Sequence, residues 1–220
     1  MKKVLFNDDN NFIVGISDEF KSEISNQRKD GWFWEIFKKE FGSQLLELFN
    51  LNKIYGSAMI SRFYIEMNDK SGVPKYVEKL KKVWDNRDIL IIEGEYSRVG
   101  NGNDLLDNAK SIQRIIGSAK NAFNVYDKIY EEALKQGKDK LIIIALGQTA
   151  TVLAFDLYKA GYQAIDFGHI DLEYEWYKRN VTEKVNIEYK FVSEVPGGGS
   201  NIQNVTDPNY EQQIITRIQI

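Results

Sequence analysis

The feature that most constrains the fold is an aliphatic run at residues 141–146 (LIIIAL), followed by a helical pattern and a second apolar run. Residues 148–160 read as a nearly all-apolar helix that ends at Gly161, and residues 163–167 (QAIDF) return as a strand. Strands that are apolar on both faces belong to parallel sheets covered on both sides. We therefore predict an α/β, Rossmann-like fold with a mostly parallel sheet and helices on both faces.

The rest of the chain continues this alternation. No repeat and no linker interrupts it, so residues 1–220 read as one domain. The predicted strands, besides the two above, are residues 11–16, 54–60 and 88–93. The predicted helices are residues 31–49, 74–84 and 122–136, and one that begins at Asp207-Pro208 and runs to about residue 218.

Composition and charge exclude several classes of protein. With no cysteine, the chain has no disulfide framework, thiolate metal site or cysteine nucleophile. Its 29 basic and 32 acidic residues give a net charge of −3, which offers no general attraction to nucleic acid. Residues 7–11 (NDDNN) break the basic start, unlike a signal peptide, and the longest apolar run is too short to span a membrane. We expect a cytoplasmic protein without a membrane span.

Polar and glycine-rich residues follow three of the predicted strands. They are residues 93–104, residues 147–149 (GQT) and residues 168–173 (GHIDLE). In an open parallel sheet the ligand binds outside the carboxyl ends of the strands, so these segments mark one candidate edge. Gly147-Gln148-Thr149 would place backbone N–H groups where an anion such as a diphosphate binds, although a plain strand-to-helix turn explains it equally well.

The pair Asp171-x-Glu173 has two readings. In an extended segment both carboxylates point to one side and could hold a divalent cation. In the first turn of a short helix the same acids are stabilised by the helix dipole instead. About four or five acid-x-acid pairs are expected by chance in such a chain, and it has three, so the spacing alone carries no weight.

For three other features a functional interpretation stands beside a purely structural one. Helical spacing relates the aromatic residues Trp32, Phe33, Trp34 and Phe37, and it favours a core face over a surface that stacks on sugars. We expect the helix at residues 31–49 to bury this aromatic face within the domain or against a second copy. Arg98 suits a phosphate contact or a surface ion pair. Residues 196–201 (PGGGSN) suit a phosphate-binding nest or a mobile lid.

Several stretches, taken in order, resemble one family. They are Glu93-Gly94-Glu95-x-Ser97-Arg98-x-Gly100-x-Gly102-Asn103-Asp104-Leu105, Asn108-Ala109-Lys110-Ser111-Ile112, Ala145-Leu146-Gly147-x-Thr149-Ala150-Thr151-Val152-Leu153-Ala154, and Gly161-Tyr162-Gln163-Ala164-Ile165-Asp166-x-Gly168-His169-Ile170-Asp171-x-Glu173-Tyr174-Glu175-Trp176. From about Asn11 to the C-terminus, this pattern resembles the GT-D-type glycosyltransferases, a bacterial family first catalogued as a domain of unknown function.

The resemblance implies a nucleotide-sugar-dependent hexosyltransferase. Its donor would be a UDP-sugar, its acceptor a glycan or glycoprotein, and its cofactor Mn²⁺ or Mg²⁺. The family's Asp-x-Glu motif falls on Asp171 and Glu173, as ligands of the metal that bridges the donor diphosphate. Members usually begin with a Ser-Arg-Phe-Gly-Asp-Gly-Glu segment, which this chain lacks; Ser61-Arg62-Phe63-Tyr64 shares only the first three letters.

Positions at the strand ends supply the remaining site candidates. The donor-site candidates are Arg98, Asn103, Gly147, Thr149 and His169. The candidates for the base that takes the proton of the acceptor hydroxyl are Glu95 and, second, Glu194. Two other functions stay open: a non-catalytic module that binds nucleotide sugars, and a metal-dependent phosphohydrolase that uses the same carboxylates.

Overall fold

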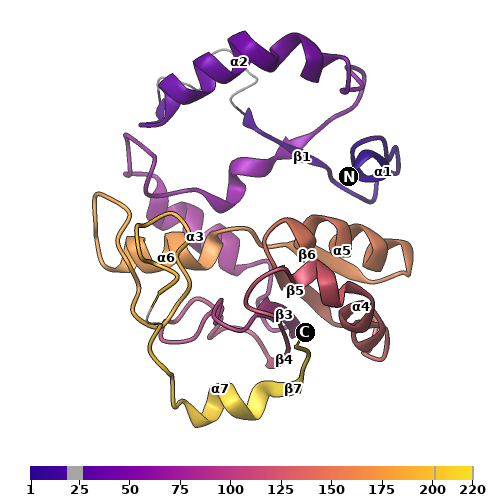
Figure 1. Cartoon of the computed structure of the whole chain (residues 1–220), viewed down its shortest axis with the longest axis vertical. Coiled ribbons are helices and arrows are strands. Elements are labelled where there is room, and N and C mark those ends of the chain that lie inside the picture. Colours follow the sequence, from indigo (N-terminus) through magenta and orange to yellow (C-terminus); the bar gives the residue numbers. More distant parts are fainter. Residues whose placement is uncertain (19–26, 201, 220) are drawn as a thin grey trace.

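The computed structural model describes residues 1–18, 27–200 and 202–219, and its centre is a five-stranded parallel sheet (Figure 1). The strand order is β6-β5-β3-β4-β7, and every neighbouring pair is parallel. The strands are β3 (Asp88–Gly94), β4 (Ser111–Gly117), β5 (Leu141–Ala145), β6 (Gln163–Asp166) and β7 (Ile214–Arg217). The predicted fold class is confirmed.

Helices cover both faces of this sheet because alternate residues of its strands point to opposite sides. Ile89 and Ile91 of β3 pack on the side of α3 (Val73–Lys81) and α6 (Ile170–Lys178). Leu90 and Ile92 pack on the side of α4 (Tyr126–Leu134) and α5 (Gln148–Lys159). All four side chains are fully buried, so β3 is the centre of two hydrophobic layers.

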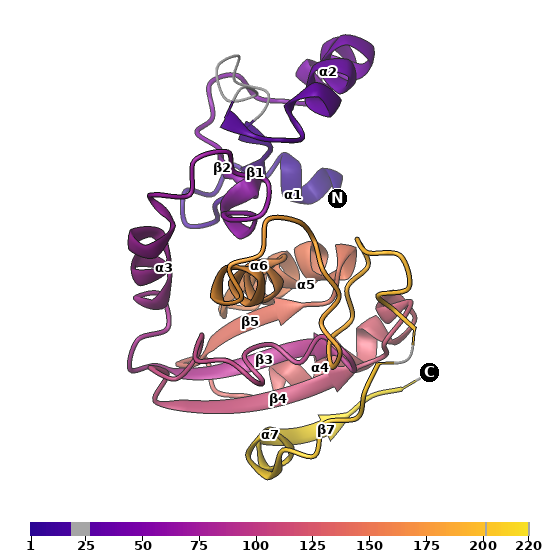
Figure 2. The ribbon, with the colours of Figure 1, turned by 90° about the vertical axis from the view of Figure 1, so that its left-hand side faces the viewer.

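The N-terminal third forms a separate layer at one end of the molecule (Figure 2). It contains α1 (Lys2–Leu5), α2 (Gly31–Leu46) and the 3-10 helix η3 (Ala58–Ser61), and strands β1 (Gly15–Ile16) and β2 (Gly56–Ser57) pair in parallel. Phe12 joins this layer to α5 by packing edge-on against Phe155, with ring centroids 5.3 Å apart. The predicted strands at residues 11–16 and 54–60 are thus reduced to two residues each.

The prediction that the aromatic residues of α2 face the core is wrong. Trp32, Phe33 and Ile36 are 67%, 47% and 52% exposed, and Gly31 is the one buried residue that the helix contributes. The aromatic rings contact one another instead, as Phe33 and Phe37 do at 6.0 Å. Periodicity placed these residues on one helical face, but α2 lies away from the sheet, so that face does not reach the core.

Two strands of the sheet escaped prediction. The strand β4 begins with the polar residues Ser111, Gln113 and Arg114, so it lacks the aliphatic signature of its neighbours. The helix predicted from Asp207 does begin there, where the Asp207 carboxylate accepts hydrogen bonds from the N–H groups of Asn209 and Tyr210. It ends early, however: α7 (Pro208–Gln213) gives way to β7, whose β-branched residues pair with β4.

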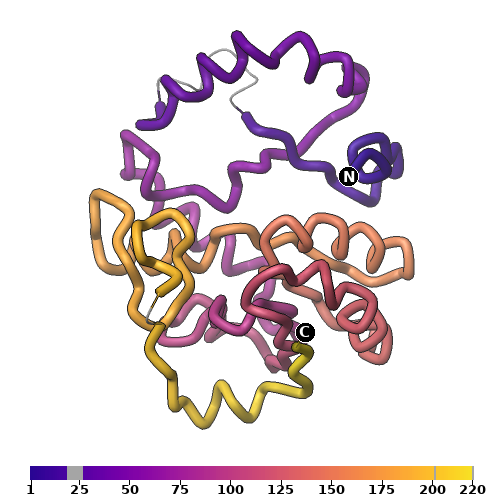
Figure 3. Tube along the Cα trace, in the orientation of Figure 1, coloured from indigo at the N-terminus to yellow at the C-terminus, as the bar shows by residue number. Residues whose placement is uncertain are grey.

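The strand order creates a switch point between β3 and β5. The chain leaves β3 toward β4 on one side, whereas it leaves β5 toward β6 on the other. Connections that diverge in this way leave a crevice at the carboxyl ends of the two strands, where open α/β sheets bind ligands. As predicted, the loops after β3, β5 and β6 share this edge, and the segment between α6 and α7 passes beside it (Figure 3).

Within the described residues, none of the helices has the length and apolar character needed to cross a bilayer.

Candidate functional site

The three carboxylates Asp171, Glu173 and Glu175 lie on α6, so the helical interpretation of this segment is right and the extended one is wrong. All three are buried, with exposures of 4% or less. Residues two apart on a helix point about 200° apart around its axis. Asp171 therefore faces the loop after β3, whereas Glu173 faces Tyr64 and Ile65, which follow η3 and belong to the core.

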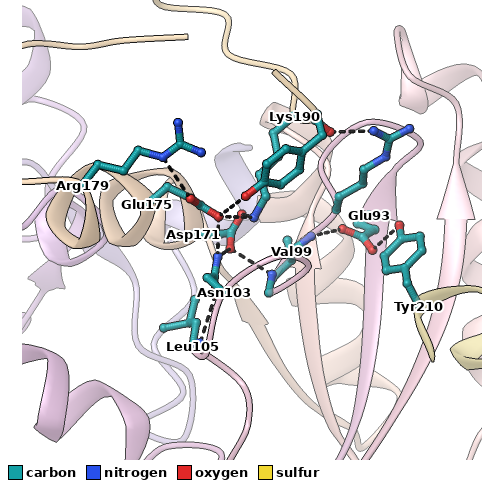
Figure 4. Close-up of polar contacts among 12 residues, drawn as sticks. Glu93, Val99, Asn103, Leu105, Asp171, Glu175, Arg179, Lys190 and Tyr210 are labelled. Atoms are coloured by element: carbon teal, nitrogen blue, oxygen red, sulfur yellow. Dashed lines mark hydrogen bonds and ion pairs between the residues drawn. The ribbon is translucent and has the colours of Figure 1, made fainter. Parts of the chain in front are cut away.

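Asp171 and Glu175 share a buried lysine (Figure 4). The Nζ atom of Lys190 lies 2.6 Å from Asp171 Oδ2 and 3.2 Å from Glu175 Oε1, and the lysine is fully buried. Asn103 Nδ2 donates to Asp171 Oδ1 at 3.1 Å and to Glu175 Oε1 at 2.8 Å, and Gly100 N donates to Asp171 Oδ1 at 2.9 Å. This cluster joins the loop after β3, α6 and the segment before α7.

Glu175 is held in its charged form by this environment. Burial raises its pKa, but the charge of Lys190 and hydrogen bonds from Asn103 and Tyr189 outweigh burial and leave the pKa below its usual value. Both oxygens of Asp171 are likewise occupied by donors. In this arrangement neither the Asp171 carboxylate nor the Glu175 carboxylate is available to bind a ligand.

The carboxylate of Glu173 accepts its hydrogen bonds on the opposite side of α6 from Asp171. Its Oε2 atom accepts hydrogen bonds from the backbone N–H groups of Tyr64 and Ile65, both at 2.8 Å. Its Oε1 atom is buried and has no partner among the described residues, and burial raises the pKa of the side chain. Asp171 and Glu173 do not converge on one point, and no three metal-binding side chains gather within residues 1–18, 27–200 and 202–219. The geometry does not fit a metal shared by this pair.

A second polar cluster surrounds Glu194. Its Oε1 atom lies 2.6 Å from Arg62 Nη2 and 2.8 Å from His169 Nε2, and its Oε2 atom lies 2.8 Å from Lys184 Nζ. Burial raises the pKa of Glu194, but the three hydrogen-bonded cationic and imidazole groups outweigh it and hold the pKa well below its usual range. A carboxylate with so low a pKa is a weak base.

Glu194 also lines an open cavity of about 540 Å³ formed by residues 191–200. Phe191 N donates to Tyr96 O at 2.9 Å, which anchors this loop to the loop after β3. The loop closes on itself through a bond of 2.9 Å from Val192 N to Gly198 O. The glycine-rich segment of the sequence therefore lies at the predicted edge of the sheet; its last residue, Asn201, is outside the described residues.

The crevice between β3 and β5 holds the other candidates. Gly147 begins α5 with φ 55° and ψ −140°, a conformation that requires glycine. Thr149 is buried in the first turn, and no side chain caps the helix. Across the crevice, Ser97 Oγ donates to Ala145 O at 3.2 Å. Glu95 follows β3 directly; its side chain is partly exposed, and its backbone N–H donates to Gly117 O at 3.1 Å.

The turn after β6 brings the N-terminal layer against this edge. Gly168 has φ 53°, and a Cβ atom there would lie 2.5 Å from Ser61 Oγ, so the close approach of Ser61 needs glycine. Asp166 fixes the turn by accepting hydrogen bonds from Gly168 N at 3.1 Å and Thr151 Oγ1 at 2.6 Å.

Arg98 has neither of its expected roles. It is 7% exposed, and its Nη1 atom donates to the backbone carbonyls of Tyr189 at 2.6 Å and Gln203 at 2.7 Å. It thus fastens the segment before α7 to the loop after β3. Glu93, of the first acid-x-acid pair, is also internal: it binds Arg114 Nη1 at 2.6 Å and accepts from Tyr210 Oη at 3.1 Å.

The structure brings Asn103 to Asp171 and His169 to Glu194, whereas it separates Asp171 from Glu173. The sequence did not single out Lys184 or Lys190, because a lysine in a charged segment carries no local signal of burial. A weak signal existed for Arg62: the Ser61-Arg62-Phe63 triplet matches the start of the family's N-terminal segment, and Arg62 lies in the site.

A parallel sheet with a switch point and polar loops at its carboxyl edge defines a Rossmann-like α/β protein, a class in which ligands bind at that edge. The chain belongs to the family described as the glycosyltransferase GT-D fold, which matches residues 1–195.

Two curated relatives are bacterial. The glycosyltransferase GlyD of Streptococcus pneumoniae is 44% identical over 209 residues, which are 94% of this chain and 25% of that protein. A probable glycosyl transferase Gly of Streptococcus gordonii is 38% identical over 186 residues, which are 84% of this chain and 27% of that protein. The chain therefore spans about a quarter of the length of the curated relatives it matches.

Solved structures agree in fold. One, a domain of unknown function 1792 described as having a distinct glycosyltransferase fold, has a TM-score of 0.92 and 39% identity, and covers 99% of this chain and 78% of its own. A second, described as a new glycosyltransferase of the same domain type from Streptococcus sanguinis, has a TM-score of 0.91 and 32% identity, and covers 99% and 81%. The resemblance noted in the sequence is confirmed.

Proposed function

We propose that this chain transfers a sugar from a nucleoside-diphosphate donor, with UDP as the nucleotide, to a hydroxyl group of a glycan or glycoprotein. The observation that carries the proposal is the switch point between β3 and β5, where the uncapped N-terminus of α5 follows β5 and Glu95 follows β3 at the same edge of the sheet. A helix N-terminus favours a diphosphate, and a crevice at a switch point is where nucleotides bind in this class of sheet. The names of the relatives support the same reaction class.

In the proposed reaction the bond between the anomeric carbon of the sugar and the diphosphate oxygen breaks. A bond forms between that carbon and the acceptor oxygen, and the hydroxyl proton passes to a carboxylate. Glu95 suits the base role better than Glu194, because Glu95 is partly exposed at the end of β3, whereas Glu194 is ion-paired and its pKa is held low. The nucleoside diphosphate leaves with the electron pair of the broken bond.

The residues proposed to bind the nucleotide-sugar donor are Gly147, Thr149, His169 and Arg62. Gly147 and Thr149 form the start of α5, and His169 and Arg62 lie at the next strand end along the edge. Asn103 and Arg98 are proposed to act indirectly, by holding the loop after β3 in place.

A divalent cation, Mn²⁺ or Mg²⁺, is a separate proposal that rests on the Asp171-x-Glu173 motif of the family. The two side chains as they lie do not share one ion, so no step above uses it. Titration of Mn²⁺ into the protein, followed by EDTA, tests it. Glu173→Gln should abolish Mn²⁺ binding if its unpartnered Oε1 atom is a ligand.

The decisive experiment measures UDP release from UDP-sugars with and without glycopeptide acceptors. A transferase releases UDP faster with acceptor and links the sugar to it. A binding module binds UDP without turnover, and a phosphohydrolase releases phosphate from simple phosphate esters. Either of the last two outcomes would overturn the proposal.

Two further proposals concern the location of the protein in the cell and its oligomeric state. A cytoplasmic location agrees with the absence of cysteine, and cell fractionation tests it. A homodimer would cover the exposed residues Trp32, Phe33 and Ile36 of α2. Sedimentation of the parent and of Trp32→Ser/Ile36→Ser tests it: the parent should dimerise with rising concentration and the variant should stay monomeric.

A further inference from the structure

Three basic side chains from separate parts of the chain surround the carboxylate of Glu194. Arg62 directly follows η3, His169 directly precedes α6, and Lys184 belongs to the segment after α6. Arg62 and His169 contact the Oε1 atom of Glu194, and Lys184 contacts its Oε2 atom, at distances between 2.6 and 2.8 Å. The fold thus gathers a guanidinium, an imidazole and an ammonium group around one carboxylate.

This cluster is accessible from solvent, unlike the buried pair of Lys190 and Asp171. The side chains of Arg62, His169 and Lys184 are 26%, 30% and 29% exposed. Their shared carboxylate also lines the open cavity of about 540 Å³ formed by residues 191–200. A small anion can therefore reach the basic groups without any opening of the core.

The loop that carries Glu194 keeps its shape through its own contacts. Val192 N donates to Gly198 O and Gly198 N donates to Val195 O, both at 2.9 Å, and Val192 is fully buried in the core. Among the described residues, the backbone groups of residues 193–200 make hydrogen bonds only within this loop. Rotation of the Glu194 side chain is then enough to separate its carboxylate from the three basic groups, and the loop itself stays folded.

Other carboxylates near the cluster do not replace Glu194. Glu66 lies 2.7 Å from Lys184 and pairs with that lysine. Glu173 attracts Arg62 only through space, since its own hydrogen bonds come from backbone N–H groups. Among the described residues, Glu194 is the one carboxylate that contacts both the guanidinium and the imidazole, so its departure leaves these two groups without an anionic partner.

The cluster lies next to the start of α5. Thr151 Oγ1, near the beginning of that helix, donates to Asp166 Oδ2 at 2.6 Å, and the same carboxylate accepts a hydrogen bond from Gly168 N at 3.1 Å. His169 is the next residue in the chain. The uncapped N-terminus of α5 and the basic cluster therefore flank the same turn at the carboxyl edge of the sheet.

We infer that Arg62, His169 and Lys184 form a site for a diphosphate group, and that Glu194 occupies this site as an internal substitute which the diphosphate displaces. The inference rests on the proposed function, in which the diphosphate is that of the donor, and adds a group of the chain that competes with it. Phosphate and carboxylate oxygens accept charge-assisted hydrogen bonds from the same donors. A diphosphate carries more oxygens and more charge than one carboxylate, so it is the stronger partner for three basic groups.

The test titrates inorganic pyrophosphate into the full chain in metal-free buffer and measures the heat of binding. Glu194→Gln should bind pyrophosphate about tenfold more tightly than the parent, because the competing charge is gone; this corresponds to about 1.4 kcal/mol. Glu188→Gln is the matched control, since it makes the same charge change at an exposed position and should bind like the parent. A gain in affinity cannot result from misfolding of the variant.

Two double variants and one spectroscopic signal locate the site. Arg62→Met/Glu194→Gln and Lys184→Met/Glu194→Gln should each lose the gain in affinity, and thermal unfolding checks that they are folded. His169 is the only histidine of the chain, so the NMR signal of its ring reports on this site alone and should shift when pyrophosphate binds to the parent.

Three results would overturn the inference: no gain in affinity in Glu194→Gln, a gain that survives in both double variants, or binding that leaves the His169 signal unchanged. UDP, titrated in parallel, separates this inference from the proposed function. If pyrophosphate behaves as expected and UDP does not bind, the donor proposal fails and the diphosphate site stands. If UDP binds equally to the parent and to Glu194→Gln, and pyrophosphate shows no gain, the inference fails and the donor proposal stands.

Discussion

Lys190 Nζ lies 2.6 Å from Asp171 Oδ2 in the interior of the protein, where the lysine has no exposed surface. The same ammonium group lies 3.2 Å from Glu175 Oε1. A buried cation of this kind is tolerated only because two carboxylates and their donors surround it. It links its own segment to α6 and, through Asn103, to the loop after β3.

Replacement of Lys190 by methionine should therefore be strongly destabilising. The substitution leaves Asp171 and Glu175 buried without their cation, which costs about 3–5 kcal/mol. Urea unfolding at pH 7 measures this loss. Lys178→Met is the control, because its ion pair with Asp104 is half exposed, and it should cost less than about 1 kcal/mol. Equal losses for the two variants would contradict the role given to Lys190.

Arg98→Met should lower stability by about 2 kcal/mol, because the charged donor of two backbone carbonyls is lost. The affinity for UDP should fall little in the folded variant, since the Nη1 atom of Arg98 already donates to two backbone carbonyls. The control Arg87→Met removes a half-buried arginine whose hydrogen bond to Gln163 is exposed, and it should be nearly neutral. A large loss of UDP affinity with unchanged stability would restore the phosphate-binding role of Arg98.

Glu95→Gln should reduce the rate of sugar transfer by about 10²–10⁴-fold, because the amide cannot accept the acceptor proton. UDP affinity and stability should stay close to those of the parent, since the side chain is partly exposed. Steady-state kinetics with saturating donor measures the effect, and Glu188→Gln serves as an exposed control of the same charge change. A rate loss confined to Glu194→Gln would instead assign the base to Glu194.

Stability should fall in mild acid because the folded-state pKa values of Glu175 and Glu194 lie below their unfolded values. A carboxylate with a lowered pKa stabilises the fold above its unfolded pKa, near 4.5, and loses this contribution as the pH falls through its folded pKa. Urea unfolding between pH 7 and pH 3 should show this decline.

Glu194→Gln should flatten that pH profile, since the glutamine does not titrate. The matched variant Glu188→Gln removes an exposed carboxylate and should leave the profile unchanged. An identical slope in the parent and in Glu194→Gln would show that the ion pairs of Glu194 with Arg62 and Lys184 do not stabilise the fold.

Much of the fold could be predicted because its central elements carry strong local signals. The aliphatic strands β3, β5 and β6 and the helices α3, α4 and α5 lie close to their predicted positions. The strand β4 was missed because Gln113 and Arg114 are polar; Arg114 is nevertheless buried, since it binds Glu93 inside the sheet. The strand β7 was missed because its pairing with β4 joins residues far apart in sequence.

The site could be predicted only as an edge of the sheet. Sequence order places Glu95, Gly147 and His169 after three strands, and a parallel sheet then gathers them. The direction in which each side chain points was not predictable in this way. Asp171 and Glu173 are two residues apart, yet they face opposite sides because the segment is a helix, and their partners come from segments remote in the chain.

The sequence by itself determined the parallel α/β architecture, the edge that carries the site and the family, because these follow from local apolar patterns and from motif order. The tertiary structure decided which charged side chains are buried. Arg98, Lys190 and Glu173 are buried because distant segments supply their hydrogen-bond partners or shield them from water. A charged residue shows no local sign of such burial, since its free energy depends on neighbours that only the folded chain brings near.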